Sequence, residues 1–131
     1  MADPQKFPPD LWYHEAHDWA RVDGAEATFG VTWFAQDSLG EIVFWEGPEP
    51  GASVSRGEPY AELESVKAVS DVVAPLSGTV LASNEALDDD PSTVNSDPYA
   101  TGWLVRVRLS DPSEVERLMS AESYSRMVSD A

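Results

Sequence analysis

The stretch Glu64-Ser65-Val66-Lys67-Ala68-Val69-Ser70-Asp71, near the middle of the 131-residue chain, determines how the rest is interpreted. On either side of its centre, apolar and polar residues alternate over residues 60–65 and 69–74. This period of two predicts two strands that meet in a tight hairpin, with Lys67 at the tip. The tip lacks Gly, Asn and Asp, which supply the positive φ angles of a two-residue hairpin. A local rule broken in this way often indicates a functional site.

Lys67 is chemically unusual within this chain. The sequence has only two lysines, and the other one, Lys6, lies in a proline-rich terminus. The remaining cations of the folded region are arginines, whose guanidinium does not deprotonate and cannot be acylated as a lysine amine can. The pattern therefore suggests that the tip requires an amine. The alternative is an ordinary exposed turn residue, because lysines and turns are both common on protein surfaces.

The remaining segments predict short strands with turns between them, followed by a helical tail. Asp23-Gly24 is typical of a hairpin turn between residues 19–22 and 27–31. Further strands are expected at 41–45, which should be buried, at 79–83 and at 103–109, and residues 75–78 should form a turn. We expect Thr32 and Gly40 to cap a short helix, and Asp111 and Ser120 to begin two more.

These elements predict a mainly β domain with helical additions. The first ten residues carry three prolines and little apolar content, so residues 1–10 are expected to form a flexible arm. Residues 11–131 are expected to form a single domain, with the helical tail beginning at about residue 111.

The charge balance excludes some classes of partner. The chain carries 24 acidic against 8 basic residues, a formal net charge of −16. Such a field repels nucleic acid and anionic membranes and attracts partners with basic faces. No apolar run is long enough to span a membrane, and no secretion signal is visible, so a cytoplasmic location is expected.

No pattern for catalysis or metal binding is present. The sequence lacks a glycine-rich phosphate loop, a nucleophile elbow and any cysteine. His14 and His17 do not have the spacing of a zincin helix, and Asp88-Asp89-Asp90 lacks the glycine and distant glutamate of an EF-hand loop. We therefore expect neither an enzyme active site nor a metal site.

Several segments around the central stretch point to one family. They are Phe29-Gly30-Val31-Thr32 with Ala35-Gln36, Leu39-Gly40-Glu41-Ile42-Val43-Phe44, Pro75-Leu76-Ser77-Gly78, Asn84-Glu85-Ala86-Leu87, Val94-Asn95-Ser96-Asp97-Pro98-Tyr99 and Gly102-Trp103-Leu104. Together with Glu64–Asp71 they resemble, in order, the glycine cleavage system H-protein family over about residues 11–128. The resemblance implies a lipoyl-domain-like barrel-sandwich hybrid of two antiparallel sheets, with short helices and a C-terminal helical tail.

The resemblance also implies a function. The chain would be a monomeric carrier, not an enzyme, with lipoate attached covalently to Lys67. It would carry an aminomethyl group from glycine decarboxylase to aminomethyltransferase and be reoxidised by dihydrolipoyl dehydrogenase. Lipoylating enzymes would be further partners, and Glu64 and Gly78 match positions that they are thought to read. Alternatively, Gly78 is a simple turn glycine.

In this family the loaded arm folds into a cleft, and the matching carboxylates here are Asp71 and Asp18. Asp18 stands where the family often has Glu, Ala16 where it often has Ser, and Phe34 where it often has His. Ala100 also departs from the family pattern, which usually has Gly or an acidic residue there.

Other functions remain open at this point. A biotinyl carrier shares the fold class, but it predicts methionines beside the lysine, where Val66 and Ala68 stand. A relay that donates lipoyl groups to other lipoyl proteins would have the same hairpin. An unmodified acidic interaction module is the third possibility.

Overall fold

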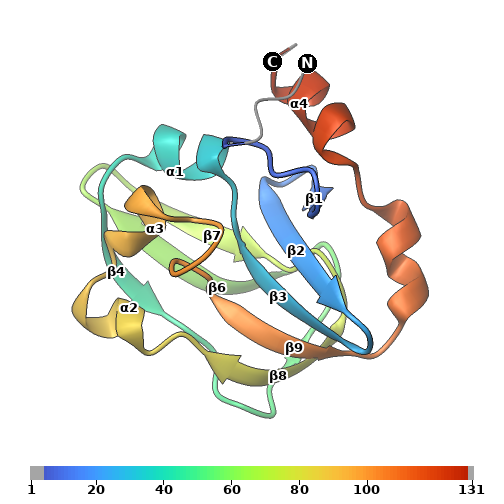
Figure 1. Ribbon diagram of the computed structural model, residues 1–131. Helices are drawn as coiled ribbons and strands as arrows, with labels where there is room; N and C mark the ends of the chain where they lie inside the picture. Colours follow the sequence, from blue (N-terminus) through green and yellow to red (C-terminus); the bar gives the residue numbers. More distant parts are fainter. Residues whose placement is uncertain (1–4, 130–131) are drawn as a thin grey trace.

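The computed structural model of this chain describes residues 5–129 and contains two antiparallel sheets (Figure 1). The six-stranded sheet has the order β1-β2-β3-β9-β8-β5. Its strands are β1 (Trp12–His14), β2 (Asp18–Asp23), β3 (Glu26–Val31), β9 (Val105–Leu109), β8 (Gly78–Ser83) and β5 (Ser53–Val54). The three-stranded sheet has the order β4-β6-β7, with β4 (Ile42–Glu46), β6 (Pro59–Ser65) and β7 (Val69–Val73). The mainly β fold of two antiparallel sheets is thus confirmed.

Short helices lie in the connections and at the C-terminal end of the chain. They are α1 (Trp33–Leu39), α2 (Ala86–Asp89), α3 (Thr93–Ser96), the 3₁₀ helix η1 (Pro112–Arg117) and α4 (Ala121–Ser129). Within residues 5–129, no helix is long and apolar enough to cross a membrane.

The main core lies between the two sheets and is formed by inward-facing apolar side chains. Phe29 and Val107 come from the six-stranded sheet, and Leu63 and Val72 come from the three-stranded sheet. The predicted hairpin at Asp23-Gly24 is present, with Asp23 paired to Glu26. Alternation in β9 places every second residue of Val105–Leu109 in the core, as period-two patterning requires.

Helix α1 and the strand that follows it are held at fixed positions by caps and by Asn95. The Thr32 hydroxyl accepts a hydrogen bond from the Ala35 amide, and Gly40 ends the helix with φ +81°, as predicted. The Asn95 side chain donates to the Gly40 carbonyl at 2.8 Å and accepts from the Ile42 amide at 2.8 Å. The end of α1, which contacts Lys67, is therefore anchored to α3.

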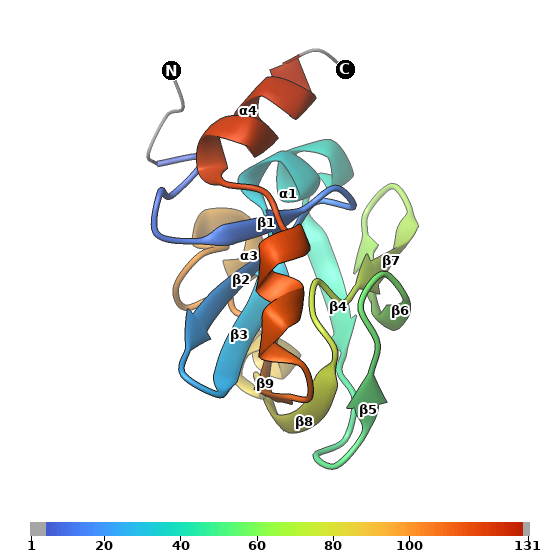
Figure 2. The same ribbon diagram turned by 90° about the vertical axis from the view of Figure 1, so that its right-hand side faces the viewer.

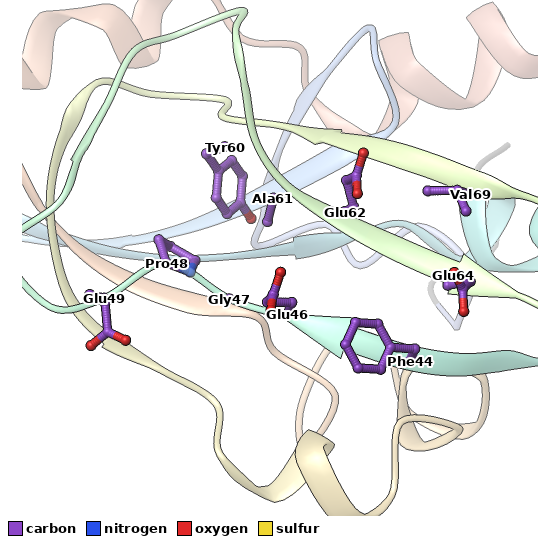
Figure 3. A pocket seen from close by; sticks show the side chains of 10 residues that line it. All are labelled: Phe44, Glu46, Gly47, Pro48, Glu49, Tyr60, Ala61, Glu62, Glu64 and Val69. Carbon is purple, nitrogen blue, oxygen red and sulfur yellow. The ribbon is translucent and has the colours of Figure 1, made fainter.

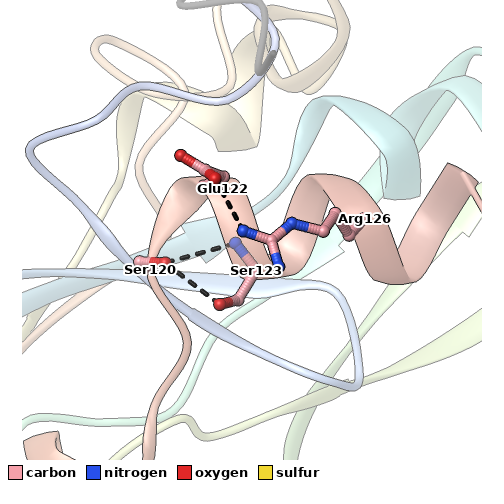
Figure 4. Close-up of polar contacts among 4 residues, drawn as sticks. All are labelled: Ser120, Glu122, Ser123 and Arg126. Carbon is pink, nitrogen blue, oxygen red and sulfur yellow. Dashed lines mark hydrogen bonds and ion pairs between the residues drawn. The ribbon is translucent and has the colours of Figure 1, made fainter.

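The C-terminal helices cover the β1 end of the larger sheet (Figure 2). Ser120 accepts a hydrogen bond from the Ser123 amide at the start of α4, and Glu122 pairs with Arg126 one turn later (Figure 4). Tyr124 of α4 is fully buried and stacks on Tyr13 at a centroid distance of 4.9 Å. A second apolar cluster thus fixes α4 against β1.

Two local expectations were wrong. The strand expected to be buried at 41–45 is present as β4, but Val43 and Phe44 are both exposed, because one face of the three-stranded sheet meets solvent and a register shift between Ile42 and Phe44 interrupts the alternation of faces. Gly78, expected in a turn, is instead the first residue of β8.

Only residues 5–10 of the predicted N-terminal arm lie within the described part of the chain. Phe7 packs edge-on against Tyr124, and the Pro8 carbonyl accepts a hydrogen bond from Tyr13 at 2.7 Å. The Lys6 ammonium lies 4.3 Å from the centroid of the Trp33 ring.

Candidate functional site

The tip of the β6–β7 hairpin is organised by the side chain of Ser65. Its hydroxyl accepts hydrogen bonds from the amides of Lys67 at 3.2 Å and Ala68 at 3.1 Å. The Ser65 amide also donates to the Ala68 carbonyl at 2.8 Å. A serine hydroxyl that bonds the backbone two and three residues ahead stabilises a turn without positive φ angles. This explains how the hairpin closes without Gly, Asn or Asp.

Lys67 is exposed at this tip, which projects beside α1 (Figure 2). Its ammonium donates to the Ser38 carbonyl at 3.0 Å and forms no ion pair with any residue in the range 5–129. The Lys67 side chain crosses Gly40, where an added Cβ would lie 3.2 Å from the lysine Cε. The amine is therefore free to react and already lies along the end of α1.

A cleft of about 170 Å³ begins at this end of α1 and runs between the two sheets. Its walls are largely apolar: Val31, Phe34, Ala35, Leu39, Leu63 and Val72. Ser38, which binds the Lys67 ammonium, lines the same cleft as Asp18 and Asp71. The structure therefore brings the lysine and both predicted carboxylates to one site, from β2, β7 and the hairpin tip.

The two carboxylates differ sharply in environment. Asp18 is only 2% exposed, and its Oδ2 has no hydrogen-bond partner among the described residues. Burial raises the pKa of the Asp18 carboxyl well above its usual range, although the Val73 backbone amide bonds the charged form. Asp71 is exposed at the other side of the cleft. A cation entering the cleft would thus meet two different carboxyl groups. Asp71 is exposed to water, whereas Asp18 is buried and has one oxygen without a hydrogen-bond partner among the described residues.

His17 is a cleft residue that sequence reasoning did not select. It has φ +74°, the only positive φ of a non-glycine residue in the described part of the chain. Its Nδ1 forms a 2.8 Å hydrogen bond with the Tyr124 hydroxyl, and its ring lies 4.8 Å from the ring of Phe34. Burial lowers the pKa of His17, which favours the neutral ring. The position of His17 in the cleft wall depends on its hydrogen bond with Tyr124 of α4, which is more than 100 residues away in the sequence, so no local pattern predicts it.

Of the three residues Ala16, Phe34 and Ala100, which depart from the family pattern, two lie in the cleft and one does not. Ala16 and Phe34 both line the cleft, so they change its wall directly. Ala100 is exposed in the turn before Trp103 and does not line the cleft.

Glu64 lies outside the cleft, on the exposed face of the three-stranded sheet (Figure 3). There it lines an open groove of about 480 Å³ beside Val69 and Phe44. Glu46, Glu49 and Glu62 line the same groove. None of these glutamates forms an ion pair within the described residues, so the surface next to the hairpin is acidic with exposed apolar side chains.

Gly78 is buried, and packing alone requires a glycine there. An added Cβ would lie 2.1 Å from the Arg108 carbonyl oxygen and 2.4 Å from a Val107 methyl group. Close packing therefore explains the glycine at this position without any role in lipoylation.

His14 and His17 line different pockets on the two sides of the β1–β2 turn. Within the described part of the chain, no group of three or more His, Cys, Asp or Glu side chains could hold a metal ion.

Comparisons with known proteins agree on one family. A family profile described as "Glycine cleavage H-protein" matches residues 11–131. The glycine cleavage system H proteins of Bacillus cereus (strain AH820) and Bacillus anthracis (strain A0248) are each 50% identical over 121 residues, covering 92% of this chain and 95% of theirs. The crystal structure of such a protein from Mycobacterium marinum is 38% identical with a TM-score of 0.85, and the match covers 93% of this chain and 98% of that one.

Proposed function

The chain belongs to the glycine cleavage H-protein family, and on this premise we propose that it carries lipoate on Lys67 and shuttles aminomethyl groups in glycine cleavage. It is a carrier and not itself a catalyst. The observation that carries the proposal is the exposed Lys67 amine, which donates a hydrogen bond to Ser38 at the α1 end of a cleft that also contains a buried, partly unbonded carboxylate.

The residues present fit a lipoyl group. Lys67 offers an exposed primary amine for amide formation, and the apolar walls of the cleft suit an alkyl chain and a dithiolane. A bound lipoyl group supplies a redox-active disulfide on a long arm, which accepts and releases the one-carbon unit. The protein supplies presentation of this arm and a place to hold its end.

Asp18 and Asp71 are proposed to hold the cationic amine of the cargo. Charge-assisted hydrogen bonds to carboxylates are about twice as strong as neutral ones, and the unbonded Oδ2 of Asp18 is available for one. The apolar walls around them exclude water, which protects the cargo from hydrolysis. His17 and Phe34 close one side of this space through their ring contact.

The partners that this function requires are glycine decarboxylase, aminomethyltransferase, dihydrolipoyl dehydrogenase and the lipoylating enzymes. The acidic groove beside the hairpin supports docking by basic faces with an apolar contact, since Phe44 is 51% exposed among unpaired glutamates. Glu64 at the edge of this groove is the proposed recognition residue for lipoylation.

Intact-mass measurement tests the attachment. Protein from its native host should carry one lipoyl adduct, and Lys67→Arg should remove it while leaving the fold intact, because charge and length are nearly kept. The matched control is Lys6→Arg, the only other lysine substitution, which should retain the adduct.

Wild-type protein without a lipoyl adduct, or an adduct that survives Lys67→Arg, would contradict the carrier function. A biotinyl adduct would instead support the second carrier class. A lipoyl relay is distinguished by transfer from this chain to other lipoyl proteins in the absence of glycine.

A further inference from the structure

We propose that a second pocket, separate from the Lys67 cleft, binds a small oxyanion such as phosphate or a carboxylate. This pocket, here called the arginine pocket, has a volume of about 160 Å³. It lies between the β1–β2 turn, the loop after β5, and the C-terminal segment η1–α4. The side chains that matter are Arg56, Arg117, His14, Glu15, Met119 and Met127.

The two arginines lack carboxylate partners in a chain that is rich in carboxylates. Arg106 and Arg126 each form an ion pair, whereas Arg21 and Arg108 form none within residues 5–129 and do not line this pocket. Arg56 and Arg117 have no ion pair with any residue in the range 5–129, yet they line the same pocket. Their positive charges therefore accumulate at one place on an otherwise acidic molecule.

Arg56 also has an unmet hydrogen-bonding requirement. Its Nε is buried and has no partner within the described part of the chain. A buried donor without an acceptor is costly, and a charged one more so. An oxyanion in the pocket would satisfy this donor, because the guanidinium fork matches carboxylate and phosphate oxygens.

The pocket is built from fixed elements. The Ser77 hydroxyl accepts a hydrogen bond from the Arg56 amide at 2.9 Å and donates to a Glu114 carboxylate oxygen at 3.0 Å. The Ser77 amide donates to the other oxygen of Glu114 at 2.8 Å. Ser77 thus ties the loop that carries Arg56 to the 3₁₀ helix that carries Arg117, so both arginines are held near one another in advance.

His14 supplies a further donor. Its Nδ1 accepts a hydrogen bond from the Ala16 amide at 3.0 Å, which assigns the proton of the neutral ring to Nε2. That N–H forms no hydrogen bond with another residue in the range 5–129, and its nitrogen is accessible although the His14 residue as a whole is buried, so it is open to a ligand in the pocket. Glu15 at the rim is the one carboxylate of the pocket and opposes anion binding.

The arginine pocket and the Lys67 cleft lie on two sides of the same turn. His14 and Glu15 face the former, whereas Ala16, His17 and Asp18 line the latter. Anion binding does not require lipoate, so its test is independent of the proposed carrier function.

The test is an NMR titration of the full chain with inorganic phosphate and, separately, with acetate, each replacing chloride at constant ionic strength near neutral pH. Saturable shifts of the Arg56 Nε–H and His14 ring signals are expected, with dissociation constants in the millimolar range. A lower dissociation constant for phosphate than for acetate would indicate that the pocket prefers a tetrahedral oxyanion. The opposite order would indicate that it prefers a carboxylate.

The His14 pKa gives a second readout. It is lowered first by burial and then by Arg56, against the opposing effect of Glu15. Arg117 is the other charged group of the pocket. A bound anion would screen both arginines, so the His14 pKa should rise when phosphate is added.

Three variants make the result decisive. Arg56→Gln should raise the His14 pKa without phosphate and abolish its response to phosphate, whereas Glu15→Gln should tighten binding severalfold. The matched control is Arg108→Gln, which removes one exposed positive charge on β9 and should leave binding unchanged. Non-saturating shifts, or equal shifts in Arg56→Gln and wild type, would overturn the proposal.

Discussion

Asp18 is a buried residue whose environment is expected to destabilise the folded state. Asp18 is 2% exposed and one of its oxygens is unbonded within residues 5–129, so its charged form is poorly stabilised. Such a group is retained where a function uses it, which is the reasoning behind its proposed contact with a cationic cargo.

Asp18→Asn should therefore stabilise the protein at neutral pH. Because the folded-state pKa of Asp18 is raised, the folded state holds a proton that the unfolded chain releases above about pH 4. The contribution of Asp18 to stability is thus fully present below that pH and is lost as pH rises through the folded-state pKa. We expect Asp18→Asn to raise the free energy of unfolding by about 1–3 kcal/mol at neutral pH, with the gain shrinking near pH 4.

Denaturant unfolding of both proteins at several pH values measures this difference. Asp71→Asn is the matched control, since it removes an acid from the same cleft but from an exposed position, and little change in stability is expected. A gain for Asp18→Asn that does not depend on pH would contradict the argument. Both variants should shorten the lifetime of the aminomethyl cargo that the chain is proposed to carry, measured as release of ammonia or formaldehyde.

At the scale of elements, the hairpin tip depends on one side chain rather than on special backbone angles. Ser65 is buried and its hydroxyl bonds the amides of Lys67 and Ala68. Each such bond contributes about 1 kcal/mol, so Ser65→Ala should speed amide hydrogen exchange at these two residues by about fivefold. The proposed lipoylation of Lys67 should also slow, because the acceptor amine is less well positioned.

Ser65→Thr retains the hydroxyl and is the matched comparison. It should keep exchange protection at the tip closer to that of wild type. Unchanged protection of Lys67 and Ala68 in Ser65→Ala would show that the rest of the hairpin, including the bond from the Val66 amide to the Glu41 carbonyl, holds the tip by itself.

Local patterns predicted the elements well, and the site only in part. The caps at Thr32 and Gly40 and the β6–β7 hairpin follow from short-range chemistry and are confirmed. The exposure of Phe44 was missed because a strand's own residues do not reveal which face of its sheet meets solvent. The burial of Asp18 was missed for a similar reason, since the cleft forms from segments far apart in the chain.

The resemblance to a family selected Lys67, Asp18 and Asp71 as a set, and the structure brings their chain segments together. No local signal identified His17 or the arginine pocket. Both depend on contacts with the C-terminal segment, such as the bond from His17 to Tyr124 and the Ser77–Glu114 link.

At the scale of the whole molecule, charge has two opposing consequences. The formal net charge is −16, and the described residues contain only two ion pairs, Arg106–Glu26 and Arg126–Glu122. Self-repulsion between so many unpaired carboxylates destabilises the folded state, whereas the same field speeds the approach of a basic partner. Salt weakens both effects, because at 0.1 M ionic strength interactions between exposed charges more than about 10 Å apart are largely screened.

Adding sodium chloride should therefore stabilise the protein while slowing its association with the proposed partner aminomethyltransferase. We expect the melting temperature to rise by roughly 3–5 °C, about 1 kcal/mol for a domain of this size, as self-repulsion is screened. The association rate constant, measured by stopped-flow fluorescence, should fall over the same salt range. Chloride is the appropriate anion because phosphate or acetate would also occupy the arginine pocket.

Two sets of substitutions separate local from overall charge. Glu46→Gln with Glu62→Gln removes two charges from the groove beside the hairpin, and Asp88→Asn with Asp89→Asn removes two from the α2 region. Both pairs should raise the melting temperature at low salt by similar amounts, because self-repulsion depends on total charge. Only the groove pair should slow association severalfold, since steering depends on where the field is directed. Equal rates for the two pairs would place the docking surface elsewhere on the molecule.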